Sequence, residues 1–203
     1  MQVKLLHNTP LWVASKAIRK CWASEDKSDN GGEKDKELIY RVGNKNKHAS
    51  TLEHLNYTFD IDGVSRALLQ EKARHRHASI SVKSTRYTLK ELKDKPNDGS
   101  FDYRSLVVLT TDTRVNTSIL RGLSELQLRL REGISNDLVK YILPEAYKTS
   151  YVWTINARSL QNFLELRSSS AALWEIRLLA QAIYDAIPDD HKYLFKECMQ
   201  QEV

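Results

Sequence analysis

Cationic, imidazole and hydroxyl side chains gather in one short stretch of the chain, residues 74–87. Four permanent cations and two histidines fall within these fourteen residues. Guanidinium groups bind phosphate oxygens in bidentate fashion and neighbouring hydroxyl groups supplement them, so the stretch suits a nucleotide chemically. The same composition is also typical of a solvated basic segment at a helix end, where cations offset the helix dipole. Residue types alone leave both interpretations open.

The spacing within and around this stretch is more specific. Arg74-His75-Arg76 is followed by seven residues and then by Ser84. An upstream block, residues 48–54, precedes an alternating segment and Gly63-Val64-Ser65-Arg66. A downstream block contains Trp153-Thr154-Ile155-Asn156-Ala157-Arg158-Ser159-Leu160, Asn162-Phe163, Leu166-Arg167 and Trp174-Glu175-Ile176-Arg177. In this order and at these spacings, the three blocks resemble flavin-dependent thymidylate synthases over most of the chain.

The resemblance implies an enzyme that reductively methylates dUMP to dTMP. The carbon donor would be 5,10-methylenetetrahydrofolate, and the hydride would come from FAD reduced by NADPH. The family forms no covalent cysteine adduct with the pyrimidine, which agrees with Cys21 and Cys198 lying outside all three blocks. We therefore interpret both cysteines as packing or incidental thiols. The family also implies a homotetramer in which each flavin site is built from more than one subunit.

Carried onto this chain, the resemblance assigns a flavin site. A pyrophosphate needs cations and donors, and the isoalloxazine ring needs hydrogen-bond partners that tune its electronics. The residues that match the family's FAD contacts are His48, Ser50, Glu53, Arg74, His75, Arg76, Val82, Asn156, Ala157, Arg158 and Asn162. Taken as a solitary histidine, His48 would instead be assigned to the solvated surface.

The resemblance also assigns a dUMP site and two catalytic residues, Arg167 and Ser84. The matching dUMP residues are Glu71, Lys72, Ala73, Arg74, Val82, Lys83, Ser84, Thr85, Arg86, Lys140 and Arg167. A fixed cation beside the uracil favours ionisation at N3 and raises electron density at C5. From residue types alone, Arg167 could instead form a structural ion pair with Glu165 or Glu175.

Several positions depart from the family pattern. Glu71 and Lys83 stand where glutamine is common, Val82 stands where an acidic residue is common, and Ala171 stands where some members carry histidine. Asp137 and Lys140 stand where a Glu…Arg pair is usual. Because lysine lacks the planar fork of arginine, a contact from Lys140 should be less directional. The positions that keep the family pattern are Arg74, Arg76, Ser84, Arg86 and Arg167.

The elements that must position these residues follow from periodicity. Apolar spacing predicts helices over residues 10–23, 34–42, 64–73, 119–130 and 173–187, the second ending at Gly43 and the last at Pro188. Alternation predicts strands over residues 57–61, ending at Gly63, around 80–87 and over 151–155. In the middle strand, Ser84 and Arg86 would share one face. Residues 93–100 are predicted to form a surface loop.

Helices and strands interleave without repeats or long linkers, so we expect an α+β (mixed α/β) fold. The prediction is a single domain over residues 1–203, with a mainly antiparallel sheet flanked by helices. No apolar run approaches the length of a transmembrane helix and no secretory signal is evident, so we expect a cytoplasmic protein without membrane association. Two cysteines cannot form a multi-bridge disulfide framework.

The net charge of +5 suits a phosphate-bearing partner but does not distinguish a polymer from a small nucleotide. A nucleic-acid-binding domain using residues 74–87 is one alternative, although it leaves the order of the three blocks unexplained. A non-catalytic flavin or nucleotide sensor is another, suggested by the altered positions 71, 82 and 140. A zinc site at His75, His77 and Cys198 is weaker still, since His-x-His is no zinc signature. We expect no metal and no nucleic acid.

Overall fold

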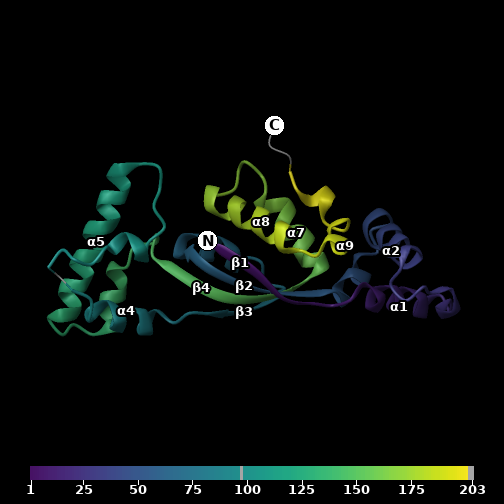
Figure 1. Cartoon of the computed structure of the whole chain (residues 1–203), viewed down its shortest axis with the longest axis horizontal. Coiled ribbons are helices and arrows are strands. Elements are labelled where there is room, and N and C mark those ends of the chain that lie inside the picture. The colour runs from purple at the N-terminus through teal and green to yellow at the C-terminus, as the bar shows by residue number, and fades with distance from the viewer. Residues whose placement is uncertain (97, 201–203) are drawn as a thin grey trace. The chain divides into compact units, whose positions relative to one another are not determined.

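A four-stranded sheet with the strand order β1-β2-β4-β3 organises the fold (Figure 1). The computed structural model describes residues 1–96 and 98–200. The strands are β1 (Gln2–Asn8), β2 (Asn56–Ser65), β3 (Ala78–Val82) and β4 (Lys148–Asn156). The mixed α/β architecture with an antiparallel sheet flanked by helices confirms the predicted fold class.

The central pair of strands, β2 and β4, is antiparallel in a fixed register. The amide of Ala157 donates to the carbonyl of Leu55 at one end, and the amide of Arg66 donates to the carbonyl of Tyr147 at the other. Between them, the hydroxyls of Thr58 and Thr154 lie 3.0 Å apart. Because side chains alternate along a strand, this register directs the aromatic residues of both strands toward one face.

The helices are distributed before, between and after the strands. Their bounds are α1 (Leu11–Cys21), α2 (Glu33–Ile39), α3 (Arg66–Ala73), α4 (Thr85–Lys93), α5 (Thr113–Arg131), α6 (Asn136–Val139), α7 (Ala157–Arg167), α8 (Trp174–Ala186) and α9 (Asp189–Lys192). Across residues 1–96 and 98–200, no helix has the length and apolar character needed to span a membrane.

The chain divides into two compact units. Among the described residues, the first contains 1–61, 72–81 and 151–200, and the second contains 62–71, 82–96 and 98–150. In the first unit, α7 and α8 lie over one face of the sheet (Figure 1). Phe59 and Trp153 of the sheet and Phe163 of α7 are fully buried there. Their rings pack edge to face or tilted, which fixes α7 relative to β4.

The second unit has its own apolar core between α4 and α5. Leu89 and Leu92 of α4 pack with Leu126 and Leu130 of α5 and with Val139 of α6. The side-chain amide of Gln127, which is also buried, donates through Nε2 to the backbone carbonyls of Leu92 and Lys95. These contacts hold the C-terminal end of α4 against α5.

The structure corrects the prediction that the strand around residue 80 continues to residue 87. β3 ends at Val82, and Thr85 begins α4, so Ser84 and Arg86 do not share a strand face. Ser84 is the N-cap residue of α4, with extended backbone angles. The burial of Leu89 and Leu92 against α5 explains the helix, because it supplies the apolar contacts that a short basic segment needs to become helical.

Two glycines act differently from their predicted role as terminators. β2 continues through Gly63, which has φ of +70°, a conformation that favours glycine. After α2, a π-helical turn at Tyr40–Lys45 passes through Gly43. A Cβ at position 43 would lie 2.7 Å from Cδ2 of Leu52, so glycine permits close packing there rather than ending the helix.

The predicted helices at 10–23 and 173–187 and the predicted strand at 151–155 are confirmed by α1, α8 and β4. Strand β1 and helix α7 were not among the predicted elements. α7 begins where Asn156 caps it, since its side-chain oxygen accepts a hydrogen bond from the amide of Ser159 at 2.9 Å.

Candidate functional site

A cavity of about 1140 Å³ in the first unit gathers most of the predicted flavin residues. Its volume is sufficient for a large cofactor, since ligand pockets usually span about 300–1,000 Å³. The lining residues are Glu53, Arg74, His75, Arg76, His77, Asn156, Arg158, Ser159, Asn162, Glu165, Leu166, Arg167, Ser169, Ala171, Ala172 and Gln200. Four arginines are therefore concentrated on one concave surface.

The Arg-His-Arg segment reaches the cavity directly after α3 ends. The amide of His75 donates to the carbonyl of Lys72 at 3.0 Å, which forms a turn between the helix and β3. The turn leaves Arg74 and Arg76 exposed on either side of His75. The His75 ring is half-buried and meets Phe163 of α7 edge to face at 5.0 Å. The segment therefore presents two exposed cations on either side of one half-buried imidazole.

The start of α7 contributes a second set of polar side chains to the cavity. Capping by Asn156 fixes the start of α7, and Arg158 in its first turn and Asn162 in its second both line the cavity. The Arg158 guanidinium lies 2.7 Å from the Glu53 carboxylate, so the upstream block reaches the same cavity through an ion pair. Ala157 is fully buried and does not line the cavity.

Arg167, the last residue of α7, contacts the Arg-His-Arg segment directly. Its Nε–H donates to Nε2 of His75 at 3.0 Å. An imidazole nitrogen that accepts from a guanidinium carries no proton of its own, so this geometry favours the His75 tautomer with its proton on Nδ1. The two side chains thus orient each other at the cavity wall.

His48 and Ser50 do not line this cavity. Both are exposed at the start of a 3₁₀ helix, Ala49–His54, whose first turn is held by the Thr51 hydroxyl donating to the carbonyl of His48. Glu53 from the same helix does line the cavity. The upstream block is therefore placed at the cavity through one of its three predicted residues.

The predicted dUMP residues at the end of β3 and directly after it belong to the second unit. Val82, Lys83, Ser84 and Arg86 are exposed, and Thr85 is half-buried. The amide of Lys83 donates to the carbonyl of Ser150 and fixes the end of β3. Exposed hydroxyl and cationic groups at a helix start are well suited to bind an anion, because the first backbone amides of a helix have no partner within it.

Asp137 and Lys140, the two positions that depart from the family's Glu…Arg pair, lie in α6 and directly after it. Arg86 of α4 forms an ion pair with Asp137 of α6 at 3.2 Å, and Lys140 is exposed directly after α6. The pair is exposed, so it constrains Arg86 only weakly. Arg86 can exchange Asp137 for a phosphate without a large loss of energy.

The three dUMP candidates at the end of α3 have different environments. Glu71 is half-buried, Ala73 is exposed, and the Lys72 side chain is buried with 2% exposure. Any contact from Lys72 to a nucleotide must then come from its backbone.

Sequence reasoning did not assign several cavity residues to the site. They are His77, Ser159, Glu165, Leu166, Ser169, Ala171, Ala172 and Gln200. Ser159 and Leu166 lie one helical turn from assigned residues of α7, so helical spacing would have found them once that helix was recognised. Gln200 carries no local signal: its amide donates to the carbonyl of Glu165 across the tertiary fold.

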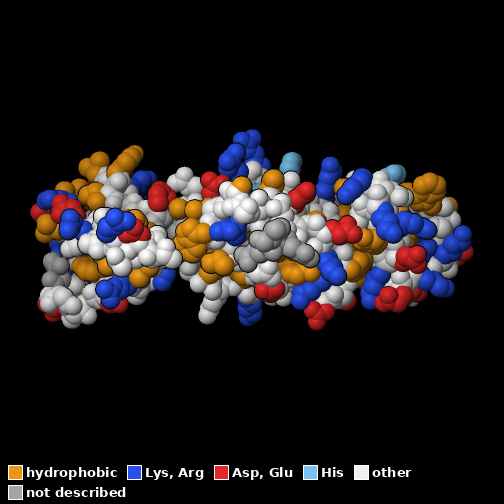
Figure 2. Space-filling view, turned by 90° about the horizontal axis from the view of Figure 1, so that it is seen from above, with side chains coloured by type: hydrophobic (Ala, Val, Ile, Leu, Met, Phe, Trp, Pro, Cys, Tyr) orange, Lys and Arg blue, Asp and Glu red, His pale blue; other side chains and the backbone are white. Residues whose placement is uncertain are grey.

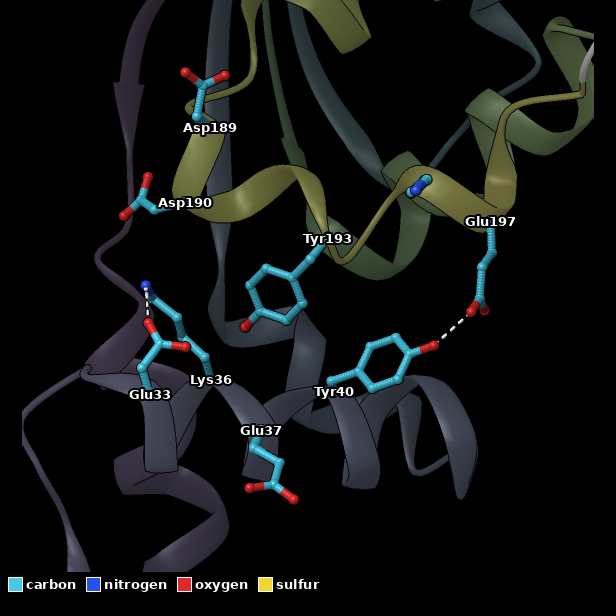
Figure 3. Close-up of a pocket in the computed structure, with 9 residues that line it drawn as sticks. Glu33, Lys36, Glu37, Tyr40, Asp189, Asp190, Tyr193 and Glu197 are labelled. Carbon is cyan, nitrogen blue, oxygen red and sulfur yellow. Dashed lines mark hydrogen bonds and ion pairs between the residues drawn. The ribbon is translucent and has the colours of Figure 1, made fainter.

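A second cavity, of about 540 Å³, lies between α2 and the chain around α9 (Figure 3). Its charged lining consists of Glu33, Glu37, Asp189, Asp190 and Glu197 against Lys36 and Lys196. Figure 3 shows Glu33 paired with Lys36 and Glu197 paired with Tyr40. An acidic lining does not suit a phosphate ligand, so we place the candidate site in the arginine-lined cavity.

Charges of both signs cover the surface of α1 and α2. Over α1 and α2, Lys and Arg side chains are interspersed with Asp and Glu side chains (Figure 2).

Comparison with known proteins identifies the family of the chain. The family model for thymidylate synthase complementing protein matches residues 4–190. The chain is 57% identical over 206 residues to a flavin-dependent thymidylate synthase of Campylobacter jejuni, covering 100% of both chains. It is 58% identical over 205 residues to the flavin-dependent thymidylate synthase of Wolinella succinogenes, again covering 100% of both.

A solved structure has the same fold. The crystal structure of the flavin-dependent thymidylate synthase of Helicobacter pylori complexed with FAD and dUMP superimposes with a TM-score of 0.93. That match has 51% sequence identity and covers 98% of this chain and 100% of the other.

Proposed function

Because the chain belongs to the thymidylate synthase complementing protein family, we propose that it is a flavin-dependent thymidylate synthase that converts dUMP to dTMP. The observation that carries this proposal is the cavity in which Arg74, His75 and Arg167 meet Asn156 and Arg158. The methylene group would come from 5,10-methylenetetrahydrofolate and the reducing equivalents from NADPH.

The residues of the cavity fit FAD by charge and by hydrogen-bonding capacity. Arg74, Arg76 and Arg158 are exposed cations that can bind a pyrophosphate. Asn156 is committed to capping α7, so Asn162 is the amide on that helix best placed to bind the cofactor's polar edges. A reduced flavin held by these residues would be the source of hydride for the reaction. His48, Ser50, Ala157 and Val82 are further FAD contacts that the family pattern suggests.

Arg167 has the role of stabilising charge on the pyrimidine. A guanidinium keeps its proton under all ordinary conditions, so it can hold negative charge that develops at N3 of the uracil. That stabilisation raises electron density at C5, where the new carbon bond forms. The hydrogen bond to His75 fixes the direction in which the Arg167 fork points.

The dUMP phosphate and sugar are assigned to the segment that opens α4. Ser84 and Thr85 offer hydroxyl groups, and Arg86 and Lys83 offer cations. Glu71, Ala73, Lys140 and the backbone of Lys72 complete the set that the family pattern suggests.

We also propose a cytoplasmic homotetramer with shared flavin sites, without nucleic-acid or membrane partners, in which residues 1–203 act as one functional domain. Tyr87, Leu138 and Tyr141 are 73%, 66% and 85% exposed. Contact with another subunit would remove these apolar side chains from water. The position of His48 and Ser50 outside the cavity is also consistent with their serving a neighbouring subunit's flavin.

The test combines cofactor content with product formation on one purified sample. We expect yellow protein whose flavin absorbance bleaches on reduction, and dTMP after incubation with dUMP, methylenetetrahydrofolate, NADPH and FAD. Protein that retains FAD but forms no dTMP would instead be a non-catalytic sensor. A colourless protein that takes up no FAD even with dUMP present, and binds oligonucleotides in a salt-dependent manner, contradicts the proposal.

Replacing Arg74 by alanine should weaken the binding of both FAD and dUMP. Hydrogen bonds to charged groups contribute about 1.5–3 kcal/mol, so each dissociation constant should rise about tenfold or more. Flavin fluorescence titration measures the first, and isothermal calorimetry measures the second. Arg121→Ala, an exposed arginine of α5, serves as the control. Unchanged affinities for both ligands in Arg74→Ala would exclude the shared contact.

A further inference from the structure

Lys72 carries its ammonium group into the aromatic core of the first unit. The residue is 2% exposed. Its Nζ lies 4.5 Å from the ring centroid of Trp153 and 4.9 Å from that of Tyr151, both on β4. These distances lie within the range of cation–π attraction, which is strongest when the cation has lost its water.

This arrangement is costly for folding. Burial lowers the pKa of the Lys72 ammonium to about 7, because the charged form is poorly solvated. Within the part of the chain that the structure describes, the buried Oη of Tyr151 and Nε1 of Trp153 have no hydrogen-bond partner. An apolar side chain of similar length would fill the same space at a lower cost. A lysine at this position therefore points to a role other than stability.

Two short routes connect Lys72 to the candidate site. The backbone route is one hydrogen bond, which the His75 amide donates to the Lys72 carbonyl at 3.0 Å. The side-chain route runs through rings: Trp153 meets Phe163 edge to face at 5.0 Å, and Phe163 meets His75 in the same way at 5.0 Å. His75 in turn accepts the hydrogen bond from Arg167.

We propose that Lys72 is a positioning residue, whose ammonium, held over Trp153 and Tyr151, sets the orientation of His75 and Arg167. The inference rests on the proposed function only in taking the arginine-lined cavity as the flavin site. Lys72 does not touch the ligands through its side chain. Its effect is to fix the turn after α3 and the ring against which His75 packs.

Lys72→Met tests the proposal because methionine keeps the length of the side chain and removes the charge. We expect kcat for dTMP formation to fall about five- to tenfold, the size expected when a contact acts through its neighbours. The KM for dUMP should change less than about twofold on the same grounds. The dissociation constant of FAD, measured on protein without substrates, should rise about fivefold for the same reason. The melting temperature should rise, because the desolvated ammonium is gone.

Two further variants separate charge from packing. Lys72→Arg keeps a cation over the rings and should recover most of the lost turnover. Lys20→Met removes a lysine whose side chain is 79% exposed and should behave like wild type.

The outcomes separate this inference from the proposed function. Wild-type turnover and wild-type FAD affinity in Lys72→Met would overturn the positioning role and leave the synthase assignment intact. A less stable or unfolded Lys72→Met would also overturn it, because Lys72 would then be a structural residue. If wild-type protein binds FAD but makes no dTMP, the synthase assignment fails, and the FAD affinities of the variants still decide the role of Lys72.

Discussion

Replacing Arg167 by alanine is expected to lower kcat for dTMP formation by about 10²–10³-fold, the usual effect of removing one preorganised donor from a developing anion. The affinity for FAD should fall far less, by under about tenfold, because Arg74, Arg76 and Arg158 remain in the cavity. Steady-state kinetics with saturating FAD gives the first quantity, and fluorescence titration of the free protein gives the second.

The contrast between the two quantities is what identifies a catalytic group. A residue that serves only to bind the cofactor would change both in parallel, whereas one that acts in the transition state lowers kcat selectively. Arg41→Ala, at an exposed position of the first unit, controls for the loss of a positive charge. Turnover at the wild-type level in Arg167→Ala would show that Arg167 has a structural role instead. The kcat of the Arg167→Lys variant should lie between those of wild type and Arg167→Ala, since lysine keeps the positive charge but lacks the planar guanidinium.

The candidate site could be predicted from the sequence where residue spacing and local structure agree. Arg74, His75 and Arg76 follow a helix end. Asn156 caps α7, and Arg158 and Asn162 lie in its first two turns. Each group is therefore positioned by contacts between residues close in sequence. The meeting of the two groups depends on the packing of α7 over β4, which no local pattern specifies. The family resemblance supplied that information.

The correctly predicted elements have a clear periodicity of apolar residues in their own sequence. In β4, Tyr151, Trp153 and Ile155 alternate with less buried residues, and this period matches the observed burial. α4 lacks such a signal because basic and hydroxyl residues fill its first turn, and only Leu89 and Leu92 reveal its buried face. Tertiary packing against α5 decides its conformation, whereas the pattern of the segment alone predicts a strand.

The buried network around Asp35 was not visible from spacing either. Asp35 lies on α2 and is fully buried. Its Oδ1 accepts two hydrogen bonds from the Arg19 guanidinium at 2.7 and 2.8 Å. Its Oδ2 accepts from the hydroxyls of Ser15 and Ser28 and from the amide of Gly31. One carboxylate thereby joins α1, the following loop and α2.

Asp35→Asn should destabilise the protein by about 3–5 kcal/mol, because it leaves the Arg19 cation buried without its anion. The NH₂ group of the new asparagine would also face N–H and O–H groups that donate hydrogen bonds to the Asp35 carboxylate. Chemical denaturation followed by tryptophan fluorescence, at one protein concentration, measures the change. Asp189→Asn breaks an exposed pair with Lys192 and should leave the free energy of unfolding close to that of wild type. A comparable small change in Asp35→Asn would show that the network contributes little.

The pH dependence of unfolding gives an independent test of the same network. Burial acts to raise the pKa of Asp35, but the hydrogen bonds from Ser28, Gly31, Arg19 and Ser15 outweigh it and lower the pKa to about 2. In the unfolded chain the carboxyl has its ordinary pKa of 3.8. The folded state therefore holds the ionised form more strongly, so the stabilisation is complete above about pH 4 and is lost as the pH falls toward 2. The difference in unfolding free energy between wild type and Asp35→Asn should shrink over that window, and a difference that stays constant down to pH 2 would contradict an ionised Asp35.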